Sequence, residues 1–255
     1  MGFSAAWLAL REPADLAARD AGLLAAAVQA AGPAPIIVDL GCGTGSTLRA
    51  FQPHLTTNPT WRLVDADPAL LDRAALLAGP DVALHQLDLR RIDDLPFDGA
   101  QLVTASALLD LCARDWVVAL ADRLARMSLP FYAALTYDGV MTWTPADPDD
   151  AAVTAAFNTH QRGDKGFGPA LGPDAADVCA EIFSAAGFRV MQAESPWHLA
   201  EADAALQADL VTGIAAAATE AGHDATAWGA RRAAAAAATL CHIGHRDFLA
   251  LPIKG

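Results

Sequence analysis

"VDLGCGTGSTL", residues Val38 to Leu48, is the stretch that decides the fold of this chain. An apolar run ends within it, and three glycines then follow at alternate positions, Gly41, Gly43 and Gly45. Glycine at this density after an apolar run marks a backbone that must approach something closely. The stretch therefore predicts a buried strand, a ligand-binding loop and the start of a helix.

Strands and helices alternate on the C-terminal side of this loop. Proline at position 68 favours a helix start, because the first turn of a helix tolerates proline best. This alternation is typical of a parallel, doubly wound α/β sheet, in which ligands bind at the carboxyl ends of the strands. The expected strands cover residues 36–40, 61–67, 81–89, 100–108 and 129–137, the last ending near Asp138, and the expected helices run to about 52, from 68 to 77 and from 114 to 127.

The two ends of the chain follow other patterns. Residues 3–30 read as two helices broken at Pro13, since proline interrupts a helix. After a Pro/Asp-rich link at 144–150 we expect a helix to about His160, a glycine-rich loop at 162–174, a helix at 175–187, a strand at 188–199, about forty residues of alanine-rich helix, and a closing strand at 241–252. We expect one domain over 1–255, with N-terminal helices (1–33), a cofactor-binding core (34–138), and a substrate-side loop, helical lid and closing strands (139–255).

Composition narrows the class of protein. The chain has 255 residues, and 17 basic against 30 acidic side chains give a net charge of -13, which repels nucleic acid. Four cysteines without CxxC spacing predict neither a zinc site nor a disulfide framework. No targeting segment or membrane span is recognisable, so we expect a soluble, cytoplasmic protein. His242 and His245 are poorly spaced for a metal, and we expect none.

Two cofactors are compatible with a glycine loop between a strand and a helix. The dinucleotide fingerprint is GxGxxG, whereas this loop is GxGxG and carries Ser46 at the third glycine position of that fingerprint. Asp39 precedes the first glycine by two residues and would repel a pyrophosphate, but it suits the cationic S-adenosylmethionine. The charge pattern favours S-adenosylmethionine over a nicotinamide dinucleotide.

With these residues in view, the sequence resembles the class I S-adenosylmethionine-dependent methyltransferases, and VDLGCGTGS is similar to their first motif. The resemblance covers residues 35–137 and implies a Rossmann-like, mostly parallel seven-stranded sheet. The alanine-rich helical insertion between the last two expected strands departs from the family's pattern. It implies that Asp65, at the end of the second strand, binds the ribose hydroxyls. Asp67 is the alternative, and it is also suited to cap the helix that begins at Pro68.

The resemblance extends to a third signature in HQLDLRRIDDLPFDGAQLV, residues 85–103. It implies that Asp88 accepts a hydrogen bond from the adenine amino group and that Leu89 lies beside the ring. It also implies that residues after the fourth strand line the active site. Ser106 is a cofactor candidate there, and Asp110 is a catalytic candidate, with a helix cap as the alternative role.

Polar and cationic groups gather around residues 158–168 of an otherwise acidic, alanine-rich chain. His160 is our second catalytic candidate, because a histidine is suited to act as a base near neutral pH. Arg162 and Lys165 are suited to bind a carboxylate or phosphate of the substrate. A solvated helix end is the alternative, because cations are favoured at a helix C-terminus.

Two further contacts are expected from other parts of the chain. The resemblance implies that an arginine before the first strand holds the carboxylate of the cofactor, and Arg19 or Arg11 fits that position. Trp197 is a candidate wall of the substrate pocket, with a place in the core as the alternative.

The leading hypothesis is methyl transfer from S-adenosylmethionine to a small-molecule acceptor, with an anionic acceptor favoured by Arg162 and Lys165. The alternatives are a methyltransferase that acts on protein or RNA, a non-catalytic protein that binds S-adenosylmethionine, and a nicotinamide-dependent oxidoreductase. The sequence leaves the acceptor and the oligomeric state open.

Overall fold

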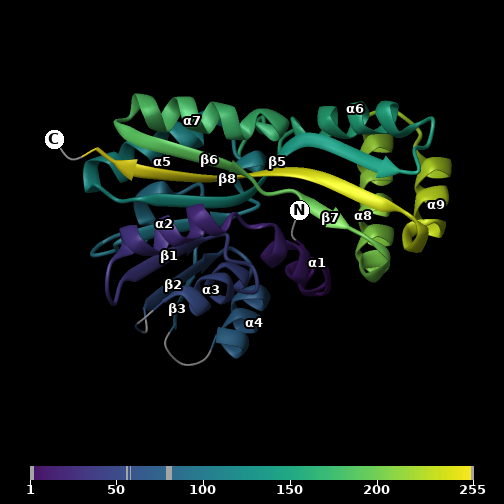
Figure 1. Cartoon of the computed structure of the whole chain (residues 1–255). Coiled ribbons are helices and arrows are strands. Elements are labelled where there is room, and N and C mark those ends of the chain that lie inside the picture. Colours follow the sequence, from purple (N-terminus) through teal and green to yellow (C-terminus); the bar gives the residue numbers. More distant parts are fainter. Residues whose placement is uncertain (1–2, 56, 58, 79–81, 254–255) are drawn as a thin grey trace.

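The computed structural model describes residues 3–55, 57, 59–78 and 82–253. Eight strands among them form one twisted sheet in the order β3-β2-β1-β4-β5-β8-β6, and β7 pairs with β8 beyond the end of β6 (Figure 1). Strands β1 to β5 pair in parallel, while β6, β7 and β5 all pair antiparallel to β8. The expected α/β fold with a mostly parallel sheet is confirmed.

The strands are β1 (Ile36–Leu40), β2 (Thr60–Asp65), β3 (Val82–Gln86), β4 (Leu102–Ser106), β5 (Phe131–Thr144), β6 (Phe188–Glu194), β7 (Trp197–Leu199) and β8 (Leu240–Pro252). The α-helices are α1 (Ala5–Ala18), α2 (Ala21–Ala31), α3 (Ser46–Phe51), α4 (Pro68–Ala78), α5 (Arg114–Met127), α6 (Asp150–Gln161), α7 (Ala175–Ala185), α8 (Ala204–Glu220) and α9 (Thr226–Ala234).

The parallel half of the sheet is covered on both faces. Helices α5 and α7 pack with alternate residues of β1, β4 and β5 in one apolar cluster, and α2, α3 and α4 pack with the other face in a second cluster. Strands buried on both faces need continuous apolar runs, which is why IIVDL and LVTAS read as such in the sequence. This packing fixes the carboxyl ends of β1, β2 and β4 side by side.

The antiparallel half extends beyond the parallel strands. In Figure 1, β5 and β8 run on together to the end of the molecule where α6, α8 and α9 lie. A third apolar cluster fills this end, built from β5, β7 and β8 on one side and α6, α8 and α9 on the other. Strand β5 therefore continues to Thr144, and the expected end near Asp138 is wrong because pairing with β8 resumes after a bulge.

The expected strand at 188–199 divides into two. Proline at position 196 has no amide hydrogen for a sheet ladder, and the chain breaks there between β6 and β7. The amide of Ser195 still donates to the carbonyl of His245 at 2.8 Å, so both pieces remain on β8. This division gives eight strands where seven were expected, and α8 and α9 form the expected helical insertion before the closing strand.

The boundary between the two N-terminal helices lies further along the sequence than expected. Helix α1 continues through Pro13 to Ala18, and its packing against β7 and α8 outweighs the loss of one backbone donor. The break comes at Arg19 and Asp20, where the Asp20 carboxylate accepts the amide of Leu23 at 2.7 Å and caps α2.

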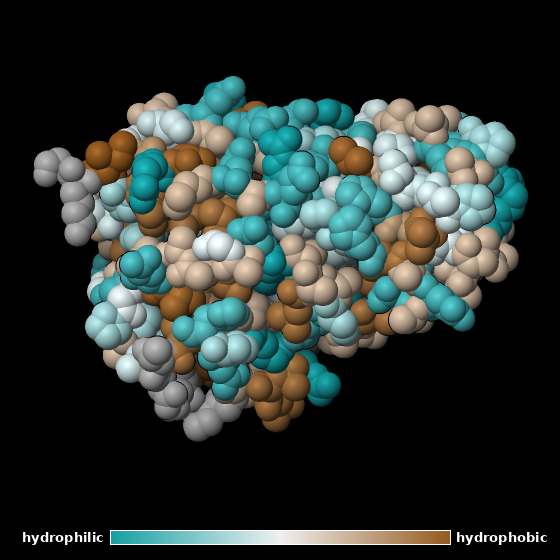
Figure 2. All heavy atoms as spheres, in the orientation of Figure 1, coloured by the Kyte–Doolittle hydropathy of each residue, from teal (hydrophilic) through white to brown (hydrophobic). Residues whose placement is uncertain are grey.

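On the face shown in Figure 2, hydrophobic residues form small separate patches among hydrophilic ones. Within the described part of the chain, no helix combines the length and the apolar character that a bilayer crossing requires.

Candidate functional site

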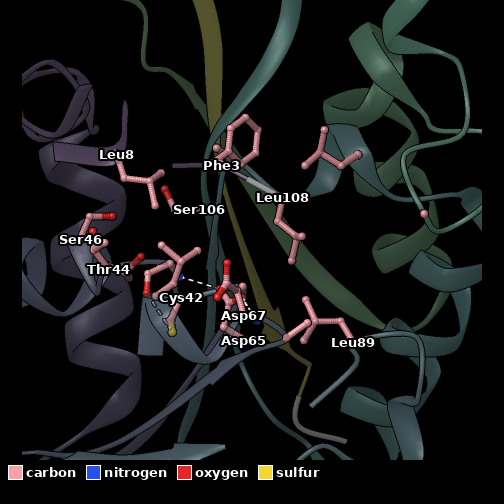
Figure 3. Close-up of a pocket in the computed structure, with 18 of the residues that line it drawn as sticks. Phe3, Leu8, Cys42, Thr44, Ser46, Asp65, Asp67, Leu89, Ser106 and Leu108 are labelled. Atoms are coloured by element: carbon pink, nitrogen blue, oxygen red, sulfur yellow. Dashed lines mark hydrogen bonds between the residues drawn. The ribbon is translucent and has the colours of Figure 1, made fainter. Parts of the chain in front are cut away.

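A cavity of about 560 Å³ lies at the carboxyl ends of β1, β2 and β4, where an α/β sheet of this kind binds its ligands. Figure 3 places Asp65 and Asp67 at its centre, Thr44 and Ser46 on one side and Leu89 on the other. Helix α1 and the loop after α6 supply the remaining wall. The cavity therefore joins three segments that are far apart in the sequence.

The glycine loop after β1 forms one wall. Gly41, Gly43 and Gly45 have φ angles of 63°, 53° and 83°, a region that side-chain-bearing residues rarely adopt. A Cβ atom on Gly43 would lie 3.1 Å from Leu8 Cδ1 of α1. Gly41 and Gly43 line the cavity, whereas Gly45 is packed against Ala74 and does not.

The two acidic residues after β2 have different roles. Asp65 Oδ2 accepts the amide of Gly43 at 2.9 Å, and its Oδ1 accepts the amide of Asp67 at 3.0 Å. Asp67 Oδ1 accepts the amide of Ala69 at 2.8 Å and thereby caps α4. Both side chains line the cavity, but Asp65 is the one tied to the glycine loop.

The turn after β3 closes the same end of the cavity. Arg90 binds both oxygens of Asp88 and lowers the pKa of this half-exposed carboxyl. Leu89 is buried, and its carbonyl accepts the indole N–H of Trp116 at 2.8 Å. Phe167 packs edge-on against Trp116, with ring centroids 5.3 Å apart. The loop after α6 is thus seated on the turn that carries Asp88 and Leu89.

A buried polar group lies behind the glycine loop. Asp39 is fully buried, and its Oδ1 accepts the hydroxyl of Thr104 at 2.8 Å. Burial raises the pKa of Asp39 to about 7, although Thr104 and the charge of Arg19 both act to lower it. Arg19 donates to Ser106 Oγ at 3.0 Å, and only Ser106 of this group lines the cavity. Asp39 and Arg19 therefore support the wall from behind.

Arg11 reaches the cavity from α1. Its Nε and Nη2 donate to the two carboxylate oxygens of Asp15 at 2.8 and 3.0 Å, and its guanidinium lies 4.9 Å from the ring centroid of Trp197. Trp197 is buried and donates to Asp15 Oδ1 at 3.0 Å. Arg11 and Asp15 line the cavity, whereas Trp197 lies beneath them and does not form its wall.

Lys165, in the loop after α6, also lines the cavity. Its Nζ lies 3.0 Å from His160 Nδ1, and His160 Nε2 lies 3.0 Å from Glu220 Oε2. His160 does not line the cavity, and both of its ring nitrogens are paired, so this geometry does not fit the expected catalytic base. Arg162 also lies outside, because it is exposed and binds Asp174.

Asp110 follows β4 but does not line the cavity. It is buried, and Leu108 and Leu111 form the wall on either side of it. Burial raises the pKa of Asp110 to about 6, opposed by its own backbone hydrogen bond and by the charges of Arg11 and Lys165. Asp110 therefore acts on the cavity through its charge, without forming its surface.

The structure brings together part of the predicted site. The predicted residues on the cavity wall are Gly41, Gly43, Asp65, Asp88, Leu89, Ser106 and Lys165, and those off it are Asp39, Gly45, Arg19, Asp110, His160, Arg162 and Trp197. The apolar wall residues Phe3, Leu8 and Phe167 were not predicted. Their only sequence signal is position, in the terminal segment and beside the loop glycines.

Comparison with known proteins agrees with this geometry. Residues 37–130 match the family described as a methyltransferase domain. A comparison with curated proteins finds no match. The matched segment runs from β1 to the start of β5, which includes the glycine loop and both acidic turns.

Several solved structures share the fold over most of the chain. The YcgJ protein from Bacillus subtilis is 15% identical over 92% of this chain and 100% of its own, with a TM-score of 0.51. Geranyl diphosphate C-methyltransferase from Streptomyces coelicolor is 13% identical over 91% and 80%, with a TM-score of 0.50. A cyclopropane synthase from Mycobacterium tuberculosis is 11% identical over 90% and 83%, with a TM-score of 0.50. At these identities the likeness shows the fold alone.

Proposed function

We propose that this chain, a member of the class I S-adenosylmethionine-dependent methyltransferases, transfers the methyl group of that cofactor to a small acceptor that carries an anionic group. One observation carries the proposal. A single cavity is lined both by the glycine loop with Asp65 and by Lys165.

The charges at the loop end suit S-adenosylmethionine better than a dinucleotide. Asp65, Asp67 and Asp88 line this end, and its cation Arg90 is already bound to Asp88. Carboxylates at this density repel a pyrophosphate but favour a ligand with ammonium and sulfonium charges. The left-handed glycines let the backbone approach such a ligand without a side chain in between.

Different residues of the cavity wall would bind different parts of the cofactor. Asp65, fixed by two backbone amides, would accept the ribose hydroxyls, and Leu89 would pack against the adenine ring. Asp88 would accept from the adenine amino group while it remains bound to Arg90. Gly41 and Gly43 would lie along the amino-acid portion of the cofactor.

When bound, S-adenosylmethionine supplies a methyl group that its sulfonium already activates. The task left to the chain is to orient the acceptor and exclude water. Leu8 of α1, Leu108 and Phe167 give the cavity apolar surface. These side chains would remove water from the line of attack.

Lys165 supports an anionic acceptor. Three cations line the cavity, and two of them, Arg11 and Arg90, are bound by carboxylates. Among the described residues, the hydrogen-bonding partner of the Lys165 amine is an imidazole, so its charge is available to a ligand. A carboxylate or phosphate of the acceptor would bind there.

The acceptor nucleophile is proposed to be unprotonated at neutral pH. Neither catalytic candidate, His160 or Asp110, is on the cavity wall, and a general base is required only for a protonated nucleophile. Asp110 is assigned to charge compensation of Arg11 and Lys165. The net charge of -13 favours a small molecule over RNA, and the four buried, unpaired cysteines suit a cytoplasmic location.

The proposal is tested by methyl transfer to a panel of small acceptors with and without carboxylate or phosphate groups, followed by mass spectrometry of S-adenosylhomocysteine release. We expect turnover of anionic acceptors. In Lys165→Met the KM for such an acceptor should rise by about 10- to 100-fold, the value of one hydrogen bond to a charged group.

Arg162→Met is the matched control, because it removes a cation from the same loop at an exposed position outside the cavity. Its KM should equal that of the wild-type protein. Turnover restricted to uncharged acceptors, or equal effects of the two substitutions, would refute the anionic acceptor.

A further inference from the structure

We propose that His160 is a positioning residue that, together with Glu220, holds the Lys165 ammonium in the cavity and releases it when the imidazole is protonated. The inference deepens the proposed function and rests on it, since it concerns how the anion-binding cation is placed. It assigns a role to three polar groups that the fold alone does not require.

The direction of the hydrogen bonds follows from the chemistry of the three side chains. A lysine ammonium has only hydrogens to donate, so the 3.0 Å contact between Lys165 Nζ and His160 Nδ1 requires a lone pair on Nδ1. The proton of the neutral imidazole is then on Nε2, which donates to Glu220 Oε2 at 3.0 Å. Lysine thus donates to histidine and histidine donates to glutamate, in one hydrogen-bonded chain from the cavity to the surface.

The chain joins three separate elements. His160 lies in the last turn of α6, Glu220 is the last residue of α8, and Lys165 lies in the loop that follows α6. Side-chain exposure rises from 20% at His160 to 61% at Glu220. The helical insertion, which does not line the cavity, therefore reaches it through this chain.

The loop itself is held in a defined shape. Asp164 Oδ1 accepts the amides of Gly166 and Gly168 at 2.7 and 3.0 Å, and these two glycines have φ angles of 107° and 93°. Phe167 is packed on Trp116. The loop backbone brings the lysine side chain to the cavity, but it does not fix the four-carbon side chain.

Fixing that side chain matters for binding. A free lysine loses rotamer entropy when a ligand immobilises it. A lysine already held by an imidazole has lost much of this freedom before the ligand arrives. Burial also lowers the pKa of Lys165, opposed by the charges of Glu220 and Asp110, and an anchored partner keeps the amine in place despite that desolvation.

Protonation of His160 would break the chain. An imidazolium has no lone pair at Nδ1, and two cations would then stand 3.0 Å apart. The charged groups that face this pair are Glu220, beyond the imidazole, and the buried Asp110, whose charge acts on Lys165. Neither accepts the lysine in its place among the hydrogen bonds of the described residues, so Lys165 should become mobile as pH falls through the imidazole range.

The sequence offers a direct way to observe this lysine. It contains two lysines, Lys165 and Lys254, so Lys254→Arg leaves a single lysine signal in protein labelled with ¹³C,¹⁵N-lysine. The measurement is the NMR order parameter of the Cε–Nζ bond at pH 8.0 and pH 5.5. We expect high order at pH 8.0 and the low order of a free side chain at pH 5.5.

Two substitutions of His160 distinguish the roles of its two ring nitrogens. An asparagine amide places its oxygen near the Nδ1 position, whereas a glutamine amide reaches the Nε2 position. His160→Asn should therefore keep Lys165 ordered at both pH values, since an amide does not titrate. His160→Gln should leave Lys165 disordered at both.

A pH response that persists in His160→Asn, or equal order in the wild-type protein and His160→Gln at pH 8.0, would overturn the proposal. Binding of S-adenosylhomocysteine, measured on the same samples, is expected to be unchanged by either substitution. A failure of all samples to bind it would contradict the proposed function instead, while the order parameters would still decide the role of His160.

Discussion

Asp39 is the residue on which the local electrostatics of the glycine loop depend. It is fully buried under the loop, and its Oδ2 has no partner among the described residues. Its pKa of about 7 means that the folded protein binds this proton more tightly than the unfolded chain, for which 3.8 is the ordinary value. An ionised Asp39 therefore costs stability above pH 7, and the cost is removed as pH falls toward 4.

We predict that replacing Asp39 with asparagine benefits stability more at pH 8 than at pH 5. The free energy of unfolding of Asp39→Asn minus that of the wild-type protein should fall by about 2 to 3 kcal/mol when the pH is lowered from 8 to 5. Urea denaturation at both pH values measures it. His245, whose pKa burial lowers to about 3, destabilises both proteins equally on acidification and cancels in the difference. A difference independent of pH would contradict the assignment.

For single residues, the sequence could not predict whether a side chain points into the cavity or away from it. Gly41, Gly43, Asp65 and Leu89 all lie on the wall, as the motifs that resemble the methyltransferase family implied. Arg162, by contrast, lies three residues from Lys165 and binds Asp174 on the surface. Such a difference depends on a carboxylate twelve positions away and has no local signal in the sequence.

Helix α1 is the element that completes the cavity. Glu12 of α1 binds Arg49 of α3, with Oε2 2.6 Å from Nη2, and Arg49 Nη1 donates to the carbonyl of Thr44 at 2.7 Å. Thr44 belongs to the glycine loop and lines the cavity. One arginine thus connects the covering helix to the loop beneath it.

Arg49→Met should loosen both segments at once, because it leaves Glu12 and the Thr44 carbonyl without this partner. We predict that the affinity for S-adenosylhomocysteine falls by about tenfold, as expected for the loss of hydrogen bonds to a charged group. Hydrogen exchange of residues 5–18 should accelerate in parallel.

Calorimetry and exchange mass spectrometry provide these two measurements. Arg189→Met, an exposed arginine on β6, is the control and should match the wild-type protein in both. An Arg49→Met protein with unchanged affinity would show that α1 is not coupled to the loop.

Elements were predicted best where periodicity alone determines them. Helix α5 begins and ends where its apolar spacing predicts, at Arg114 and Met127. The ends of β5 were not predictable, because its last residues are held by β8, more than ninety positions later. The break between α1 and α2 depends on the capping carboxylate of Asp20, which competed in the sequence with the more obvious Pro13.

The sheet of the molecule has two halves. The parallel half has the common α/β arrangement of strands and covering helices, and the antiparallel half is particular to this chain. The parallel half, with its glycine loop and acidic turns, was predicted from residues 35–137 because each element there carries a local signal. The antiparallel half, with α6, α8 and α9 packed on extended β5 and β8, contacts the cavity through Lys165 and its partners. In the proposed function, the first half binds the cofactor and the contact between the halves binds the acceptor.

The acidic glycine-loop cavity is proposed to bind S-adenosylmethionine and not a dinucleotide. Isothermal titration calorimetry of the wild-type protein and Asp65→Asn with S-adenosylhomocysteine and with NAD measures this choice. We expect the wild-type protein to bind S-adenosylhomocysteine, Asp65→Asn to weaken that binding by about 10- to 100-fold, and NAD to give no heat. Binding of NAD without a response to S-adenosylhomocysteine would refute this proposal.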